Sequence, residues 1–296
     1  MLLDDRARES HRHALTRAAS SRSLGWRQAV ALSLALVVAA SAGYAQRGQR
    51  GRAPGYGLPI ATPQSFDGAF HFCRVYFRGI QGGDGGGWST DYRDADLNLS
   101  TRLSELTKTP VSFDPRTKEP NHLIVQLTQP ELFHCPFIMM FEVGNFYIDE
   151  VEAANLRDYL LKGGFLWVDD FWGEYAWSIW ESQIRKVFPS GTHPIRDLPL
   201  DHPIFHLVRN VSKIPQIPSI DFWLSTGGTS ERYADSATPH VRAMTDEHDR
   251  IMVLMTHNTD FGDAFERESV SHQYFLRFSV QGYAFGLNAL VYSMTH

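Results

Sequence analysis

The stretch DEVEAANLRDYLLKGGFLWVDD, residues 149–170, decides the fold class. Its first part, residues 149–162, starts with acidic residues and repeats apolar residues at helical spacing, which predicts an amphipathic helix. Gly163 and Gly164 then predict the end of that helix. The run Phe165–Val168 is apolar at every position, as in a strand that is covered on both faces, and Asp169-Asp170 closes it. A helix followed directly by a buried strand is the repeating unit of a parallel α/β sheet.

The segments on either side continue this alternation. Before residue 149 the pattern predicts a strand at Phe70–Phe77, a helix at Asp94–Thr107, a short strand at Val111–Phe113 and a strand at Pro136–Val143. After residue 170 it predicts a helix at Glu174–Phe188, an antiparallel pair Val241–Met244 and Ile251–Met255 at the sheet edge, and a closing helix at Gly282–Met294. We therefore expect one α/β domain over about residues 66–296, with three layers and a mostly parallel sheet.

The first 45 residues have the composition of an export signal. Six arginines stand against three acidic residues in residues 1–27, followed by the apolar run Ala29–Ala42 and the small residues that precede Gln46. These are the three parts of a secretory signal peptide, with cleavage expected after Ala45. An uncleaved N-terminal membrane anchor is the alternative, although the run is shorter than the about 20 residues of a typical span. Either interpretation predicts a periplasmic domain, or one anchored in the inner membrane and facing away from the cytoplasm.

Charge and composition exclude some partners. The chain of 296 residues has a net charge of −5, and loss of residues 1–45 would make it −8, which disfavours nucleic acid. Residues 46–65 are rich in Arg, Gly and Pro and predict a flexible linker. Membrane contact is expected only through the N-terminal segment.

The chain has two cysteines, Cys73 and Cys135. Both lie in or beside apolar strand-like runs, where buried free thiols are common. A disulfide between them is the alternative in an oxidising compartment. No Cys or His spacing typical of a structural zinc site is present.

Several sequence blocks resemble the bacterial family of domains of unknown function called DUF4159. The blocks are FHFCRVYF (70–77), GGWSTDYRDADLNL (86–99), FEVGNF (141–146), GGFLWVDDFWG (163–173), DHPIF (201–205), IPQIPS (214–219), THNTDFGDAFER (256–267) and GLNALVYSMTH (286–296). The resemblance spans residues 66–296 and implies a flavodoxin-like, class I glutamine amidotransferase-like fold. It implies no established activity.

Enzymes of that fold use a cysteine nucleophile at a tight turn between a strand and a helix. The turns available here, at residues 141–145 and 168–173, contain neither cysteine nor serine, and Cys135 precedes its strand. Amidotransferase chemistry is therefore not expected.

Polar residues follow the ends of the predicted strands, where open α/β sheets bind ligands. The candidate ligand-binding residues are Trp88, Asp91, Glu142, Asn145, Asp169, Asp170, Trp172, His257, Asn258 and Asp260. Because strand side chains alternate between faces, at most one of Asp169 and Asp170 is expected to face this edge, as a cation or sugar ligand or as a helix cap.

The segment His257–Asp263 is the densest polar cluster after a strand. Its spacing H-x-x-D-x-x-D offers ligands for a divalent cation, or a base with an orienting carboxylate, although the same residue types also form turns. Asp170, His257 and Asp260 are the candidate metal ligands. Trp88 and Trp172 are candidate platforms for a sugar ring.

The glycine-rich loop Gly82–Gly87 lacks the lysine of a phosphate-binding loop, and Asp84 would repel an anion. It predicts a flexible connection rather than a nucleotide site. No cofactor other than a divalent cation is expected.

Three hypotheses for the function follow. The first is an exported, non-catalytic binding domain for a polar ligand, such as a glycan, or for a partner protein of the envelope. The second is a metal-assisted hydrolase with its site at the carboxyl ends of the strands. The third is an assembly module of a membrane complex.

Overall fold

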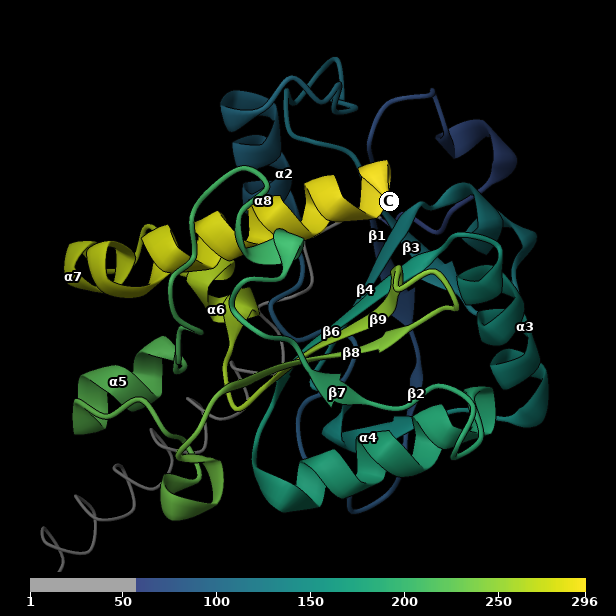
Figure 1. Ribbon diagram of the computed structural model, residues 1–296. Helices are drawn as coiled ribbons and strands as arrows, with labels where there is room; N and C mark the ends of the chain where they lie inside the picture. Colours follow the sequence, from purple (N-terminus) through teal and green to yellow (C-terminus); the bar gives the residue numbers. More distant parts are fainter. Residues whose placement is uncertain (1–56) are drawn as a thin grey trace, which may run out of the picture. The chain divides into compact units, whose positions relative to one another are not determined.

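The computed structural model describes residues 57–296 (Figure 1). The predicted export segment, residues 1–45, lies outside the described residues. The first part of the predicted linker, residues 46–56, also lies outside them. Residues 57–65 contact the domain: the Ala61 N–H donates to the Ile124 carbonyl at 2.9 Å, and the Ala61 side chain is buried. Packing against the sheet therefore begins before residue 66.

Seven strands form one sheet in the order β3-β1-β4-β6-β9-β8-β7. Their bounds are β1 (Phe72–Tyr76), β3 (His122–Gln126), β4 (Phe137–Phe141), β6 (Phe165–Phe171), β7 (Arg196–Asp197), β8 (His240–Thr245) and β9 (Ile251–His257). The strands from β3 to β9 in this order are parallel, while β8 and β7 are antiparallel to their neighbours. Numbered among themselves along the chain, the parallel strands lie in the order 2-1-3-4-5, which is the flavodoxin-like order. The predicted three-layer α/β fold is confirmed.

Helices cover both faces of this sheet (Figure 1). The α-helices are α2 (Asp94–Leu106), α3 (Glu150–Leu161), α4 (Gly173–Val187), α5 (Ile220–Thr226), α6 (Phe261–Glu266), α7 (His272–Tyr274) and α8 (Val280–Thr295). Short 3-10 helices are η1 (Pro63–Ser65), η2 (Pro130–His134), η3 (Val143–Asn145), η4 (Pro203–Phe205) and η5 (Tyr233–Ser236), and η6 (Phe275–Ser279) is a π-helix. A second, two-stranded sheet pairs β2 (Arg78–Gly79) with β5 (Phe146–Tyr147).

The central strand β4 explains the two hydrophobic cores. Its residues Phe137, Met139 and Phe141 pack with α2, α6 and α8, whereas Ile138 and Met140 pack with α3 and α4. A strand covered on both faces has to be apolar at every position, which is the pattern that the sequence shows.

Helix α3 is stabilised at its amino end by a capping box formed by its first residues. Asp149 caps α3 by accepting hydrogen bonds from the N–H groups of Val151 and Glu152, and the Glu152 carboxylate accepts from the Asp149 N–H at 3.0 Å. This reciprocal arrangement satisfies donors that the first turn leaves free.

Two predictions differ from the structure, and strand β3 was not predicted. Val111–Phe113 forms isolated bridges to Phe70 and Pro120 rather than a strand. The antiparallel pair is present as β8 and β9, but β9 lies inside the sheet and β7 forms its edge. The strand β3 was not predicted, because its short run HLIVQ has polar residues at both ends.

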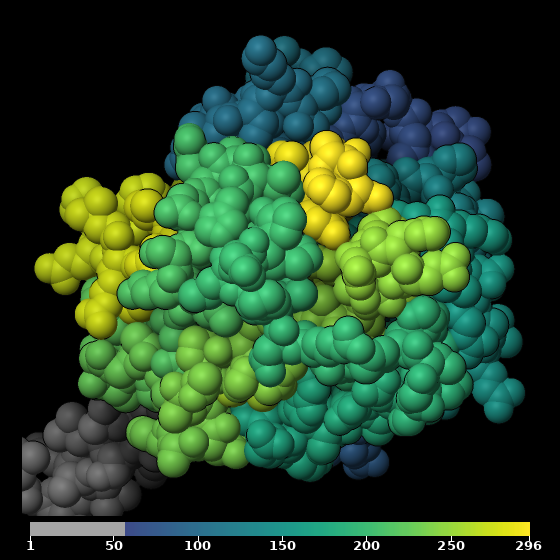
Figure 2. All heavy atoms as spheres, in the orientation of Figure 1, coloured from purple at the N-terminus to yellow at the C-terminus, as the bar shows by residue number. Residues whose placement is uncertain are grey.

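The segment between β7 and β8 contains three short helices, η4, α5 and η5, joined by irregular stretches. In the space-filling view its residues, coloured green, cover much of the face toward the viewer (Figure 2). Within residues 57–296, no helix has both the length and the apolar composition that a bilayer span requires.

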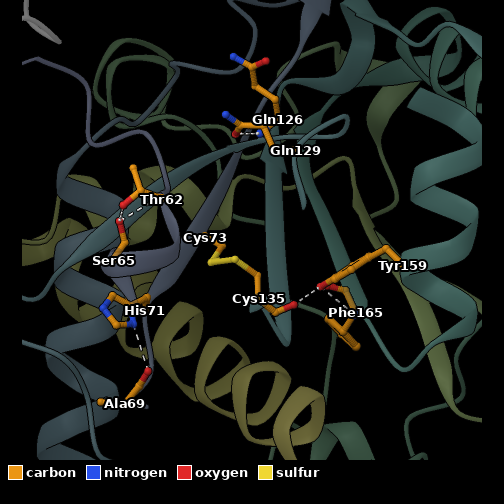
Figure 3. The surroundings of a disulfide bond; sticks show 10 residues. All are labelled: Thr62, Ser65, Ala69, His71, Cys73, Gln126, Gln129, Cys135, Tyr159 and Phe165. Atoms are coloured by element: carbon orange, nitrogen blue, oxygen red, sulfur yellow. Dashed lines mark hydrogen bonds between the residues drawn. A yellow bond between two sulfur atoms is a disulfide. The ribbon is translucent and has the colours of Figure 1, made fainter. Parts of the chain in front are cut away.

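Cys73 and Cys135 form a disulfide bond, so the expectation of two free thiols is wrong (Figure 3). Spacing along the chain could not decide this, because the two residues are 62 positions apart. The strand order decides it: β1 and β4 are neighbours, and Cys73 and Cys135 lie at the amino ends of these strands.

Candidate functional site

Three carboxylates gather at the carboxyl ends of the parallel strands. One oxygen from each of Asp91, Asp170 and Asp260 lies within 4.8 Å of the other two. Asp91 ends the loop after β1, Asp170 lies near the end of β6, and Asp260 follows β9. Only 9%, 6% and 3% of their respective surfaces are exposed. We call these three residues the aspartate triad.

Each member of the triad is held differently. One oxygen of Asp170, Oδ1, accepts a hydrogen bond from Trp172 Nε1 at 2.8 Å. Asp260 caps α6, with its Oδ1 accepting from the Asp263 N–H at 2.6 Å. The Oδ2 atom of Asp91 is buried and has no hydrogen-bond partner among the described residues. Buried oxygens are normally paired, and the neighbouring Glu266 Oε2 is also unpaired, so these two carboxylates either share a proton or can accept a further partner.

The backbone at this edge adopts an uncommon conformation. Four non-glycine residues here have left-handed φ angles: Asp91 (58°), Glu142 (47°), Asp170 (57°) and Asn258 (61°). Glu142 and Asn258 directly follow β4 and β9, Asp170 is the next-to-last residue of β6, and Asp91 lies shortly before α2. The left-handed region costs a residue with a Cβ about 1–2 kcal/mol. Conformations of this kind cluster at functional sites, where they aim side chains.

Burial sets the charge state of the triad. Burial first, and neighbouring carboxylates second, raise the pKa of Asp91, Asp170 and Asp260 well above the usual range. Within residues 57–296, no lysine, arginine or histidine forms an ion pair with any of the three. Arg74 partly offsets the charge of Asp91 without forming an ion pair, and protons or a bound cation would neutralise the remaining charge.

A second acidic group shares Asp91 but has its own counterion. One oxygen each of Asp91, Asp263 and Glu266 also lies within 4.8 Å of the others. Arg267 Nε lies 3.3 Å from Asp263 and 2.8 Å from Glu266, so this group is already partly neutralised. Burial raises the pKa of Asp263 to about 7. Sequence reasoning missed Glu266, although it extends the three-residue spacing of Asp260 and Asp263.

Glu142 and Asn145 hold the glycine-rich loop. The Glu142 carboxylate accepts hydrogen bonds from the N–H groups of Gly86 and Gly87 and from Thr90 Oγ1. Asn145 Nδ2 donates to the Gly85 carbonyl at 2.9 Å. The loop that leads into Asp91 is therefore tethered, and these two predicted ligand-binding residues use their side chains to tether it.

Asp169 points away from the triad. Its carboxylate accepts hydrogen bonds from Thr256 Oγ1 and from the Gly262 N–H, and burial raises its pKa to about 7. The expectation that one of the two consecutive aspartates faces this edge agrees with these contacts. Asp170 is that residue.

His257 lies apart from the carboxylates it was expected to join. It is 1% exposed, between the rings of Phe171 and Trp177 at 4.9 and 5.1 Å. Burial lowers its pKa to about 3, so the ring is neutral, with Nε2 3.1 Å from the Gly173 carbonyl. No cation-ligand group among residues 57–296 includes it. As the last residue of β9, it projects toward the core on the α4 side.

Asn258 fastens the end of β9 to α4. Its Oδ1 accepts from the Gly173 N–H and its Nδ2 donates to the Thr238 carbonyl, both at 2.8 Å. Both amide groups are thus used within the fold.

The two tryptophans differ in exposure. Trp172 is 5% exposed and orients Asp170 through its indole N–H. Trp88 is half-buried, and its ring lies 5.3 Å from Tyr76 and 5.8 Å from Tyr92. The expectation of a sugar platform at Trp172 is therefore wrong, because its ring is covered.

Arg74 holds the segment before Asp91 in place, and it was not among the predicted site residues. It is fully buried in β1, pairs with Asp96 at 2.5 Å, and donates to the Trp88 and Thr90 carbonyls at 3.0 and 2.7 Å. These bonds fix the chain just before Asp91. The signal for it was an arginine inside the apolar strand FHFCRVYF.

A family model described as "Domain of unknown function (DUF4159)" matches residues 72–294. No curated protein matches the chain.

Proposed function

The chain belongs to the DUF4159 family, and we propose that its domain is exported and binds a divalent cation through Asp91, Asp170 and Asp260, with a polar ligand completing the coordination. One observation carries the proposal: three buried carboxylates meet with no cationic partner among the described residues, and one oxygen of Asp91 has no hydrogen-bond partner.

The ligand set favours a small, hard cation. Asp170 and Asp260 each use one oxygen in a hydrogen bond, so each offers its other oxygen, and Asp91 offers Oδ2. Three single-oxygen ligands suit Mg²⁺, which binds few carboxylates and keeps further positions for water or ligand oxygens. Ca²⁺ usually takes more protein oxygens, including bidentate carboxylates. A glycan or another polar molecule with paired oxygens would fill the remaining positions.

The place of the triad in the fold agrees with this proposal. Asp91 lies beyond β1, which with β4 forms the pair of neighbours between which the strand order reverses direction, while Asp170 lies on the next strand, β6, and Asp260 follows β9. In open α/β sheets the crevice at such a reversal is where ligands bind.

The disulfide between the two cysteines argues against acyl transfer and so favours a binding function. Both cysteines of the chain form the disulfide, so no thiol serves as a nucleophile. The left-handed positions after β4 and β6 hold Glu142 and Asp170 where a nucleophile would stand. The same disulfide supports export, because such bonds persist in oxidising compartments.

The test is thermal unfolding of the purified full chain in chelator and in excess Mg²⁺, Mn²⁺ or Ca²⁺. A cation at a hundredfold excess over its dissociation constant would stabilise the folded state by about 2.7 kcal/mol. Asp170→Asn and Asp260→Asn should abolish this shift, and should raise the midpoint in chelator because they remove charge repulsion. Asp201→Asn, on the exposed surface, is the matched control.

Equal cation shifts in the triad variants and the wild type would contradict the proposal, as would the absence of any shift. Phosphatase or glycosidase turnover that needs the cation and is lost in Asp170→Asn would instead favour the metal-assisted hydrolase. No response to cations or sugars, with stable capture of an envelope protein, would favour the assembly module.

A further inference from the structure

A cavity of about 310 Å³ lies outside the aspartate triad. Three segments that are far apart in the chain form its lining, with charged or polar groups from Lys213, Gln216, Thr229, Arg277 and Gln281 over an apolar wall that includes Phe278. The volume is at the lower end of the range for small-molecule sites, about 300–1,000 Å³.

The charge of this cavity is opposite to that of the triad. Lys213 and Arg277 both line it, and no aspartate or glutamate does. Neither cation forms an ion pair within residues 57–296. Both residues are exposed, and in a chain with a net charge of −5 two cations without an ion pair at the rim of one cavity create a local attraction for anions.

Arg277 is oriented by aromatic rings rather than by carboxylates. Its guanidinium lies 5.2 Å from the ring centre of Phe278 and 6.0 Å from that of Trp223. Contacts of this kind position the planar group while leaving its N–H donors free for the two oxygens of a carboxylate or phosphate.

Hydrogen bonds within the protein hold the polar side chains of the lining in place. Thr229 Oγ1 donates to Gln216 Oε1 at 2.8 Å, and Gln216 Nε2 donates to the Ser236 carbonyl at 2.8 Å. Gln281 Nε2 donates to the Arg277 carbonyl at 2.6 Å, which leaves its Oε1 as an acceptor. The lining thus combines cationic donors with an acceptor suited to a hydroxyl group.

We propose that this cavity binds a small hydroxylated anion, a sugar carboxylate or a sugar phosphate, with Lys213 and Arg277 contacting its acidic group. This site is independent of the cation site. It gives the domain a second binding function with a defined chemical class of ligand.

The experiment is isothermal titration calorimetry of the full chain in chelator with glucuronate, glucose 6-phosphate and, as the neutral control, glucose. The two anions distinguish a carboxylate site from a phosphate site, and binding of at least one is expected, with no binding of glucose. Lys213→Gln and Arg277→Gln should each weaken binding about tenfold or more, since each removes a charge-assisted hydrogen bond. Lys108→Gln removes an exposed lysine elsewhere and should leave binding unchanged.

Asp170→Asn separates this proposal from the previous one, because it should keep anion binding while losing cation binding. The proposal is overturned if neither anion binds at millimolar concentration, or if Lys213→Gln and Arg277→Gln bind like the wild type. It is also overturned if anion binding requires added Mg²⁺ and is lost in Asp170→Asn, which would place the anion on the cation.

Discussion

The two ends of strands β1, β4 and β6 differ in how completely their buried polar groups are hydrogen-bonded. At the amino ends the disulfide joins β1 to the chain before β4, and the Tyr159 hydroxyl donates to the Cys135 carbonyl at 2.7 Å and accepts from the Phe165 N–H at 3.3 Å. Figure 3 shows these bonds side by side. At the carboxyl ends, Asp91 and Asp170 have left-handed backbones, and a buried Asp91 oxygen is unpaired. One sheet thus has paired, stabilising contacts at one end and, at the other, the groups that we propose bind a ligand.

The largest effect is expected from the amino ends. Replacing both Cys73 and Cys135 by alanine should lower the free energy of unfolding by about 4 kcal/mol, because the bond closes a long loop. Chemical denaturation measures this. The remaining folded protein should keep the Mg²⁺ affinity of the wild type, and loss of that affinity would show that the two ends are coupled.

A somewhat smaller effect is expected from His257, at the carboxyl end of β9, as a pH dependence of the free energy of unfolding. Burial lowers the pKa of His257 to about 3 in the folded state, so the unfolded chain takes up the proton first as pH falls below about 6.5. The stability due to neutral His257 is therefore complete above pH 6.5 and is lost as pH falls, by about 3 kcal/mol at pH 4.

His257→Gln should flatten that loss relative to the wild type in denaturation curves between pH 7 and pH 4. The same substitution at His134, which is exposed beside the disulfide, should leave the curve unchanged. If stability falls equally with pH in the wild type and in His257→Gln, His257 does not cause the loss of stability at low pH.

Two glycines allow a matched comparison of the ends. A Cβ at Gly164 would lie 2.4 Å from the Tyr159 ring, and a Cβ at Gly262 would lie 2.0 Å from Asp91 Oδ2. Gly164→Ala and Gly262→Ala should each cost about 1–3 kcal/mol through overpacking. Only Gly262→Ala should also lose the Mg²⁺-induced shift in the unfolding midpoint. Equal cation shifts in the two variants would argue against Asp91 as a ligand.

The smallest change in stability is expected at an exposed ion pair beside the site. Arg232 Nη2 lies 3.0 Å from Asp84 and ties the glycine-rich loop to the chain before η5. Asp84→Asn should change stability by less than about 1 kcal/mol. It should, however, speed Mg²⁺ release severalfold in a stopped-flow chelator chase, because the loop leading to Asp91 loses a tether.

Lys162→Gln breaks a comparable exposed pair with Asp158 near the amino ends and serves as the control. It should leave the release rate unchanged. A release rate that rises equally in both variants would show a general loosening of the fold.

Much of the fold was predictable because the amphipathic period of α3 is followed directly by the continuous apolar run of β6. Strand β3 was missed because five residues with polar ends are too short for a periodic signal to stand out. The disulfide was undecided because only the neighbouring positions of β1 and β4 bring Cys73 close to Cys135.

For the site, the rule that ligands bind at the carboxyl ends of strands placed Asp91, Asp170 and Asp260 among ten candidate residues, and these three lie together in the structure, whereas the predicted metal set contained His257 in place of Asp91. It could not exclude His257, because the direction of a side chain at the last position of a strand depends on register and on the local bulge in the pairing of β6 with β9. It also could not show that the Glu142 carboxylate and Asn145 Nδ2 bind the glycine-rich loop, since those bonds join residues more than 50 positions apart.

The left-handed backbone at Asp91, Glu142 and Asp170 also shapes how this sequence can change by mutation. Glycine adopts that conformation without the steric penalty of a Cβ, so glycine at these positions would relieve about 1–2 kcal/mol of strain each. Every aspartate and glutamate codon is a single nucleotide change from a glycine codon. A lineage with no use for these carboxylates would therefore have a short and stabilising route to losing them. Glycine at position 170 in a related genome would mark a descendant that has abandoned the site while keeping the fold.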